Sequence, residues 1–407
     1  MERTERSLRA ARLATFTYFA LNGFLMGMWI VHIPGIEHRA GTDHAVFGWL
    51  LLLLGAGAFA AMQIAGPLTD RFGARVVVSF GAALCSATLI LPGLATNAWT
   101  LGAALLVFGV GNGCLDVSMN AHAVQVERGY GRPVMSAFHA TYSLGGVLAA
   151  LVGARTLGWG WSPATTLAVA AALGLVVAAA ASRALLGRPA AVPGPDAPLA
   201  GTRHRTPRRI WSLAALALMI MLCEGVANDW SVLHLRNVLD APAATAALAF
   251  GVFATAMTTG RLLADRVAAR VGPVAILRYG ASAAALGMTV AALSPWIPLA
   301  LLGWTVFGAG LSGCVPQLFS AAGHTDHSTA GANVSRVAGL GYLGMLAGPA
   351  VIGPLTHLVP LNLTFFLPVA FCVIAACAAG ILRAPGTEPR PGKAVAPVGV
   401  RRSDSAP

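Results

Sequence analysis

The most regular feature of the chain is a series of apolar segments, each long enough to cross a bilayer as a helix. An apolar helix of about 20 residues spans the roughly 30 Å hydrocarbon core. Continuous apolar runs such as 49–62 and 167–181 argue against the short alternating strands of an outer-membrane barrel. The pattern predicts twelve membrane helices, over residues 12–34, 45–68, 76–95, 99–122, 133–155, 162–186, 210–237, 243–261, 274–293, 296–322, 330–356 and 362–382.

The segments between these helices suggest how the chain is divided. Residues 187–209 are rich in Pro and Arg and show no apolar periodicity, which indicates a flexible cytoplasmic linker. Residues 386–407 are Pro-rich and charged, which is typical of a disordered tail. We therefore expect an N-terminal six-helix bundle over residues 1–186 and a C-terminal six-helix bundle over 210–385.

Composition and charge place the chain in a membrane. The sequence is 57% hydrophobic and 10% charged, whereas soluble proteins carry about 25% charged residues. Of the 27 Lys and Arg residues, all but Arg39, Arg155 and Arg236 fall on the side of the N-terminus. This count includes Arg261, the expected cytoplasmic end of the eighth helix, and the short basic loop after it. The positive-inside rule then predicts a multi-pass protein of the inner (cytoplasmic) membrane with both termini in the cytoplasm.

The same distribution limits the choice of partners and cofactors. Because the net charge of +12 follows the membrane side, it is a topology signal and does not indicate nucleic-acid binding. The six cysteines lie within apolar segments and form no CxxC pair, so we expect neither disulfides nor a metal site. No cofactor is expected.

Two short motifs recur in the same order about 200 residues later in the chain. They are Phe108–Gly111 with Phe307–Gly310, and Asp70, Arg71 and Arg75 with Asp265, Arg266 and Arg270. Parallel six-helix halves, related by an axis along the membrane normal, are one of the repeat architectures of secondary transporters. The repeat therefore predicts an all-α membrane protein built from two pseudo-symmetric six-helix bundles.

The loop between the second and third predicted helices resembles the loop motif of the major facilitator superfamily. The matching positions are Gly66, Asp70, Arg71, Gly73 and Arg75. Ala74 departs from the motif, because a basic residue is usual there.

Three other segments, 112–121, 136–146 and 224–231, resemble a bacterial branch of that superfamily near the fucose-type sugar permeases. Many members of this branch have no assigned substrate. The resemblance covers about residues 10–385. It implies two bundles around a central cavity that opens alternately to the two sides of the membrane.

The resemblance also implies a role for the loop motif. In this family the motif latches the cytoplasmic ends of the bundles when the cavity opens outward. Asp70, in a turn that Gly73 permits, would face the positive N-terminal end of the helix that begins near residues 328–330. The alternative is a basic loop that only sets topology. The expected cytoplasmic gate comprises Gly66, Asp70, Arg71, Gly73, Arg75, Asp265 and Arg266.

A polar face interrupts the fourth predicted helix. Asn112, Asp116 and Asn120 follow one another at four-residue spacing and so share one face. A carboxylate in an apolar helix is costly, and such residues usually face a bundle interior or a water-filled cavity. We interpret Asp116 as part of a substrate or proton pathway. The alternative is a polar side chain satisfied by a neighbouring helix.

The predicted hairpin of helices four and five places Asp116 and His139 at similar depth. Each lies about six residues from the loop, or roughly 9 Å along its helix. A carboxylate beside an imidazole can exchange a proton near neutral pH. A structural hydrogen bond between the two helices is the equally weighted alternative, because depth does not fix helix rotation.

The second half offers a further set of polar residues. Glu224 and Asn228 share a face of the seventh helix, and Glu224 is expected in the outer half of the membrane, about 21 Å from residue 210. Arg336 either reaches the cytoplasmic interface or pairs with Asp116. The candidate substrate or proton residues are Asn22, Asn112, Asp116, Asn120, His139, Tyr142, Glu224, Asn228, Gln317 and Arg336.

These features favour a monomeric, proton-coupled secondary transporter of a small polar solute, sugar-like or otherwise hydroxylated. No Walker motif indicates an ATP-driven pump, and no HExxH or GxSxG motif indicates an intramembrane enzyme. A proton-driven multidrug efflux antiporter on the same fold is the main alternative. A membrane sensor that binds without transporting also stays open.

Overall fold

The computed structural model describes residues 2–42, 44–187, 206–326 and 328–383. Most of the predicted linker, at 188–205, and the whole predicted tail, at 386–407, lie outside the described residues. Helices of the first half are α1 Glu2–Ala40, α2 His44–Phe72, α3 Ala74–Thr88, α4 Ile90–Leu94, α5 Ala98–Tyr130, α6 Met135–Gly158 and α7 Pro163–Ser182. Those of the second half are α8 Arg208–Val238, α9 Ala243–Val271, α10 Pro273–Leu293, α11 Ile297–Leu311, α12 Cys314–Thr325, α13 Ala330–Leu355, α14 Leu361–Thr364, α15 Phe366–Ala378 and the 3₁₀ helix Ala379–Leu382.

The predicted membrane helices are present in the predicted order. Within the described ranges, ten helical segments are long and apolar enough to cross a membrane. The helices α9 and α13, which carry Arg261 and Arg336, complete the set of twelve. The chain is therefore a multi-pass, all-α membrane protein, as the apolar pattern predicted.

Proline explains why three predicted helices are each divided in two. The breaks follow Thr88, at Ser312, and after Thr364. In each case a proline stands four residues further on. Its ring clashes with the carbonyl of the residue four positions earlier and removes the hydrogen bond to it. The apolar pattern gives these helices the right extent but does not reveal their interruptions.

Three helices run well beyond their predicted ends, and the first of them, α1, spans Glu2–Ala40 where the sequence predicted 12–34. Helix α5 continues to Tyr130 where the sequence predicted an end at 122, and α9 continues to Val271 where it predicted an end at 261. The added turns are rich in polar and basic residues. Backbone hydrogen bonding carries a helix past the hydrocarbon core, so the first polar residue does not mark its end.

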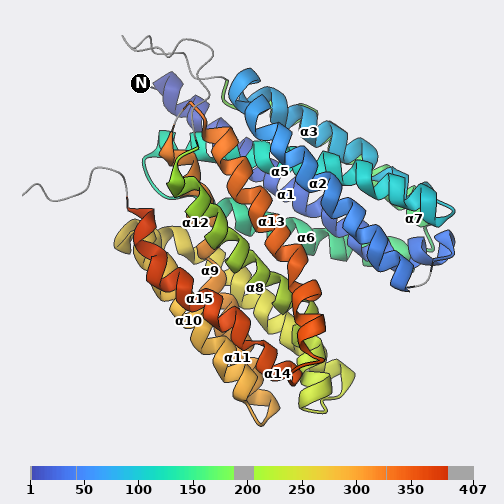
Figure 1. Ribbon diagram of the computed structural model, residues 1–407. Coiled ribbons are helices and arrows are strands. Elements are labelled where there is room, and N and C mark those ends of the chain that lie inside the picture. Colours follow the sequence, from blue (N-terminus) through green and yellow to red (C-terminus); the bar gives the residue numbers. More distant parts are fainter. Residues whose placement is uncertain (1, 43, 188–205, 327, 384–407) are drawn as a thin grey trace, which may run out of the picture.

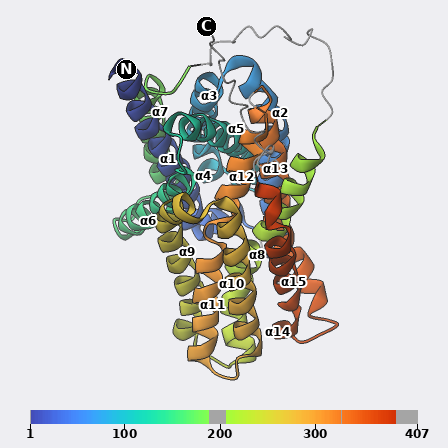
Figure 2. The same cartoon turned by 90° about the vertical axis from the view of Figure 1, so that its left-hand side faces the viewer.

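The two halves repeat the same packing. In the first half α1 packs on α6, α2 on α5, and α3 on both α5 and α7. The second half repeats this with α8 on α13, α9 on α11, and α10 on both α11 and α15. Figures 1 and 2 show the halves as separate helix bundles, with α13 lying beside α2 where they meet. The second inter-bundle contact, α6 with α9, is the symmetry-related one.

The recurring Phe-Gly motif marks equivalent helix contacts in the two bundles. A Cβ atom on Gly109 of α5 would stand 2.1 Å from the Leu54 carbonyl oxygen of α2. A Cβ on Gly308 of α11 would stand 2.3 Å from the Phe253 carbonyl oxygen of α9. Glycine therefore lets the two backbones approach closely, which is how membrane helices gain packing energy.

This contact gives a stability prediction. We expect Gly109→Ala to lower the free energy of unfolding by about 1–3 kcal/mol, because the methyl group forces α5 away from α2. Thermal unfolding in detergent measures the change. Gly251→Ala on α9 is the matched control, since its Cβ would meet no atom within 4 Å. Equal melting temperatures for the two variants would contradict the prediction.

Candidate functional site

The two bundles are joined by hydrogen bonds at one end of the molecule. Asp70 makes the first of these contacts. Gly73, with a φ of 87°, makes the turn between α2 and α3. One Asp70 carboxylate oxygen accepts from the backbone N–H of Gly331 at 2.7 Å, and the other from Ala332 at 2.8 Å. These amides open α13, the helix that the sequence indicated as the partner of Asp70. A carboxylate is stabilised there by free N–H groups and by the helix dipole.

Asp265 makes the symmetry-related contact. Its carboxylate accepts from the backbone N–H groups of Ser136 at 3.0 Å and Ala137 at 2.7 Å, in the first turn of α6. Gly272, with a φ of 82°, forms the equivalent turn after α9. Each bundle thus places an aspartate on the N-terminus of a helix in the other bundle. We call this end of the molecule the closed end.

Glu127, which the sequence analysis did not single out, strengthens the closed end. It is 6% exposed, and one carboxylate oxygen accepts from the backbone N–H groups of Val134 at 2.9 Å and Met135 at 3.0 Å. The other oxygen accepts from the Ser320 hydroxyl on α12, across the bundle interface. Glu127 lies in the last turns of α5, beyond residue 122, where the sequence predicted the end of the helix. The predicted boundaries therefore placed it in a loop.

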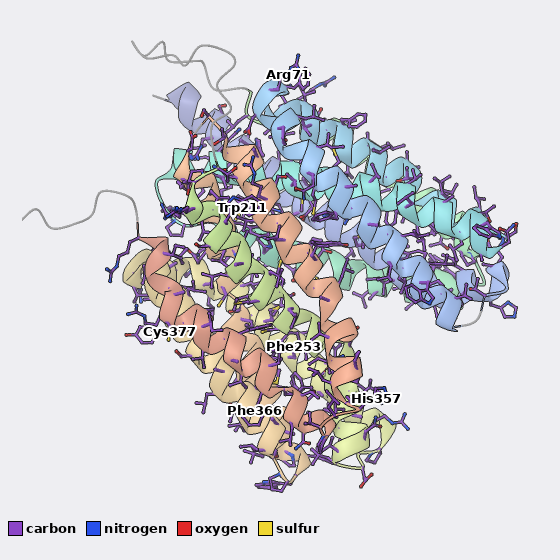
Figure 3. The ribbon with its side chains drawn as sticks, in the orientation of Figure 1. Arg71, Trp211, Phe253, His357, Phe366 and Cys377 are labelled. Carbon is purple, nitrogen blue, oxygen red and sulfur yellow. The ribbon has the colours of Figure 1, made fainter. Side chains whose placement is uncertain are left out.

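The basic residues of the predicted gate take a different position. Arg71, Arg75 and Arg266 are exposed, and Figure 3 shows Arg71 at the closed end of α2, pointing away from the bundles. Arg336 donates to the Asn333 side chain at 3.3 Å and lies in electrostatic range of Asp70. Arg336 therefore stands with the closed end, and no ion pair joins it to Asp116 in the described chain.

Asp116 lies midway along α5, between the two bundles. The Asn120 side chain donates to the Asp116 carbonyl at 2.9 Å and approaches its carboxylate at 3.4 Å. Asp116 lies in electrostatic range of Tyr142 on α6 and of Tyr342 on α13, so tyrosines from both bundles lie near it. Tyr342 was not predicted, because it comes near Asp116 only when the bundles meet.

The structure separates Asp116 from His139. Because α5 is longer than predicted, Asp116 lies about 21 Å from the loop end of its helix, while His139 lies about 6 Å from the start of α6. The His139 ring packs edge-on against Phe19 at 5.2 Å and Phe319 at 5.8 Å, measured between ring centroids. No hydrogen bond joins the two side chains among the described residues, so the equal-depth argument was wrong.

Glu224 belongs to a charged cluster that crosses the bundle interface. An Arg261 Nη nitrogen on α9 stands 3.2 Å from a Glu224 carboxylate oxygen on α8. The other Nη nitrogen donates to the Ser143 hydroxyl on α6 at 3.2 Å. The Glu224 and Arg261 side chains are only 17% and 12% exposed. An ion pair this far inside a membrane bundle is rare outside functional sites.

Arg261 lies in a helix whose end was predicted too early. The apolar pattern predicted Arg261 as the cytoplasmic end of the eighth helix, whereas it lies inside α9, one turn before Asp265. The internal repeat indicates that Arg261 lies within a helix. Asp265 is the copy of Asp70, so Arg261 is the copy of Gly66, which lies within α2.

The other predicted site residues lie on the bundle interiors. Asn22, Asn112 and Gln317 are almost completely buried, and each leaves one side-chain polar atom without a protein partner. Asn228 is half-buried on α8. Across the described ranges, no group of three or more His, Cys, Asp or Glu side chains is arranged to hold a metal ion.

Comparisons with known proteins agree with this architecture. The family model described as Major Facilitator Superfamily matches residues 14–333. An uncharacterized MFS-type transporter of Yersinia pestis is 34% identical over 375 residues, covering 91% of this chain and 96% of the relative. Among solved structures, FucP, the fucose:proton symporter of E. coli, in its outward conformation has a TM-score of 0.76 at 14% identity, covering 92% of this chain and 98% of FucP.

A second solved structure shares the fold. The human organic anion transporter MFSD10 has a TM-score of 0.72 at 14% identity, covering 92% of this chain and 99% of MFSD10. Because the family model covers most of the chain and the bacterial relative is similar along nearly its whole length, the assignment rests on sequence as well as fold. The chain belongs to the major facilitator superfamily of membrane transporters.

Proposed function

We propose that the chain is a secondary active transporter that moves a small polar solute together with protons, by alternating access. The observation that carries the proposal is the central cluster of ionisable and hydroxyl groups contributed by both bundles. Asp116, Tyr142 and Ser143 come from the first bundle, and Glu224 and Arg261 from the second. Intramembrane ionisable groups of this kind mark substrate or proton pathways.

The closed end supports alternating access. Asp70 and Asp265 each fasten one bundle to the other by hydrogen bonds to helix N-termini. Releasing these bonds would let the bundles rock about the central cluster, which stays in place between them. Since the positive-inside pattern assigns this end to the cytoplasm, we propose that the described state faces outward, with the Asp70 motif and Asp265 acting as the cytoplasmic gate.

Two proteins of the same fold are named for solutes that differ in charge, which supports a polar solute without fixing its charge. FucP is named a fucose:proton symporter and MFSD10 an organic anion transporter. Neutral and anionic polar solutes are therefore both compatible with this architecture. We propose a monomer in the cytoplasmic membrane, with Asp116 as part of the pathway of the coupled proton.

The test is solute-driven proton movement in proteoliposomes that contain the purified chain and an internal pH dye. Sugars, polyols and hydroxy acids are added in turn, and we expect one of these classes to acidify the lumen. Asp116→Asn should reduce this signal at least about tenfold, because an amide carries no proton. Asp229→Asn, an exposed carboxylate on α8, is the matched control and should behave as the parent chain.

The same assay separates the competing function. If lipophilic cations, and none of the polar solutes, move protons in the opposite direction, the chain is an efflux antiporter. If no solute of either class moves protons while solute flux persists, proton coupling is refuted.

A further inference from the structure

Arg261 has hydrogen-bonding capacity that the protein does not use. A guanidinium group has five N–H donors in a planar fork. One Nη reaches Glu224 and the other reaches Ser143. The Nε nitrogen is buried and has no partner in the described chain. A buried cation with a free donor is unusual, because an unsatisfied buried polar group is costly.

The contact between Glu224 and Arg261 is a single-point contact. One Glu224 oxygen approaches one Arg261 nitrogen at 3.2 Å. A guanidinium matches a carboxylate best when two parallel N–H donors meet the two oxygens, which is the stronger arrangement. The Glu224 carboxylate therefore pairs with Arg261 through one nitrogen–oxygen contact, and the stronger two-point arrangement is not formed.

Side chains near Arg261 could form hydrogen bonds with the hydroxyl groups of a solute. Asn112 and Asn120 lie one turn to either side of Asp116 on the same face of α5, and each leaves its side-chain oxygen unpartnered. Tyr142 and Tyr342 add hydroxyl groups from α6 and α13. Among the groups in electrostatic range of Tyr142, Arg261 is the one cation. The cluster thus combines one fork-shaped cation with several neutral acceptors and donors.

We propose that Arg261 binds the carboxylate of the transported solute, a small hydroxylated acid, and that Glu224 occupies Arg261 when the site is empty. The inference rests on the proposed function, because it names the chemical class of solute for that same site. Ser143 ties the binding fork to the first bundle, so the acid is held where the two bundles meet.

Charge balance then links the acid to a proton. An unpaired charge inside a membrane bundle is costly, so a Glu224 displaced from Arg261 must become neutral by taking one proton. One proton and one monoanion then cross together, with no net charge moved. Around the pair, Tyr142 and His139 on α6 lie in electrostatic range of Arg261, and Tyr142 also lies in range of Glu224. Asp116 on α5 and Tyr342 on α13 lie in range of Tyr142 and of each other.

Matched acid and neutral probes test the inference on the purified full-length chain. The probes are galacturonate with galactose, and glycerate with glycerol, with binding measured by calorimetry. We expect an acid to bind and its neutral counterpart to bind at least about tenfold more weakly. Arg261→Gln should weaken acid binding by roughly 10- to 100-fold, the range of a lost charge-assisted hydrogen bond.

Glu224→Gln is the decisive variant, because it keeps the shape of the side chain and removes the competing charge. It should tighten acid binding by about tenfold, whereas a merely structural ion pair would leave affinity unchanged or weaken it. Arg261→Lys retains the charge but not the fork, and should bind the acid with intermediate affinity. Arg270→Gln, an exposed arginine on the same helix, is the control and should bind as the parent chain.

Three results would overturn the inference. They are equal binding of an acid and its neutral counterpart, no tightening in Glu224→Gln, and no binding of either acid. Proton movement driven by galactose but not by galacturonate would also overturn it while leaving the proposed function intact. Tight acid binding without any proton movement would refute the proton coupling and leave the carboxylate site on Arg261 intact.

Discussion

Replacing Arg261 by Met is expected to abolish transport and to lower the free energy of unfolding by about 3–5 kcal/mol. The physical reason is the partner that remains. Glu224 would stay inside the bundle with no cation beside it, and removing one partner of a buried ion pair costs this much in other proteins. Because the two side chains are less than a fifth exposed, solvent screens the pair only weakly.

The double variant Arg261→Met with Glu224→Met is the control for this result. Apolar side chains of similar volume can replace a buried ion pair at little or no cost. We therefore expect the double variant to recover most of the stability lost in Arg261→Met, yet to remain inactive. Chemical denaturation in detergent measures stability, and proteoliposome flux measures activity.

Two outcomes would contradict the role of the pair. If Arg261→Met alone is as stable as the parent chain, the carboxylate is not buried as the structure shows. If the double variant transports normally, the pair serves only stability, and the central site lies elsewhere.

Removing both gate aspartates is expected to open the closed end. Each carboxylate accepts from two backbone N–H groups, at 2.7–3.0 Å. Hydrogen bonds to a charged group contribute about 1.5–3 kcal/mol each. Loss of both aspartates in Asp70→Ala with Asp265→Ala should therefore move the equilibrium between open and closed forms by at least about 100-fold.

Amide hydrogen exchange reports this change at the bonded groups themselves. The N–H groups of Gly331 and Ala332 at the start of α13, and of Ser136 and Ala137 at the start of α6, should exchange much faster in the double variant. Asp70→Ala alone should expose mainly the α13 amides. Asp240→Ala, in the turn between α8 and α9, is the matched control at a carboxylate that caps neither helix. Unchanged protection at all four amides would show that the carboxylates do not hold the bundles together.

The sequence predicted the fold well because hydropathy and repetition act along the chain itself. Apolar length set the number and order of the membrane helices. The repeated Asp-Arg motif correctly related the ends of α2 and α9, and the turn glycines Gly73 and Gly272 both adopt positive φ. Position along a helix also indicated the helix that receives Asp70, since its N-terminus had to lie at the same membrane side.

The central site was predicted only in part, for identifiable reasons. Asp116 and Glu224 stood out because a carboxylate in an apolar run is conspicuous. Arg261 did not, because a basic residue at the edge of an apolar run looks like a helix end. His139 was predicted at the depth of Asp116, whereas it lies near the start of α6 with its ring edge-on against Phe19 and Phe319.

By itself, the sequence determined the class of protein, its membrane helices, its two related halves and the Asp70 motif. These depend on hydrophobic length and on local backbone rules, which act between neighbours in the chain. Only the tertiary structure decided which side chains meet. The Glu224–Arg261–Ser143 cluster joins α8, α9 and α6, and its geometry depends on helix rotation and on how the bundles close. Helix rotation and bundle closure are set by packing between segments far apart in the sequence, so the hydrophobic pattern along the chain does not predict them.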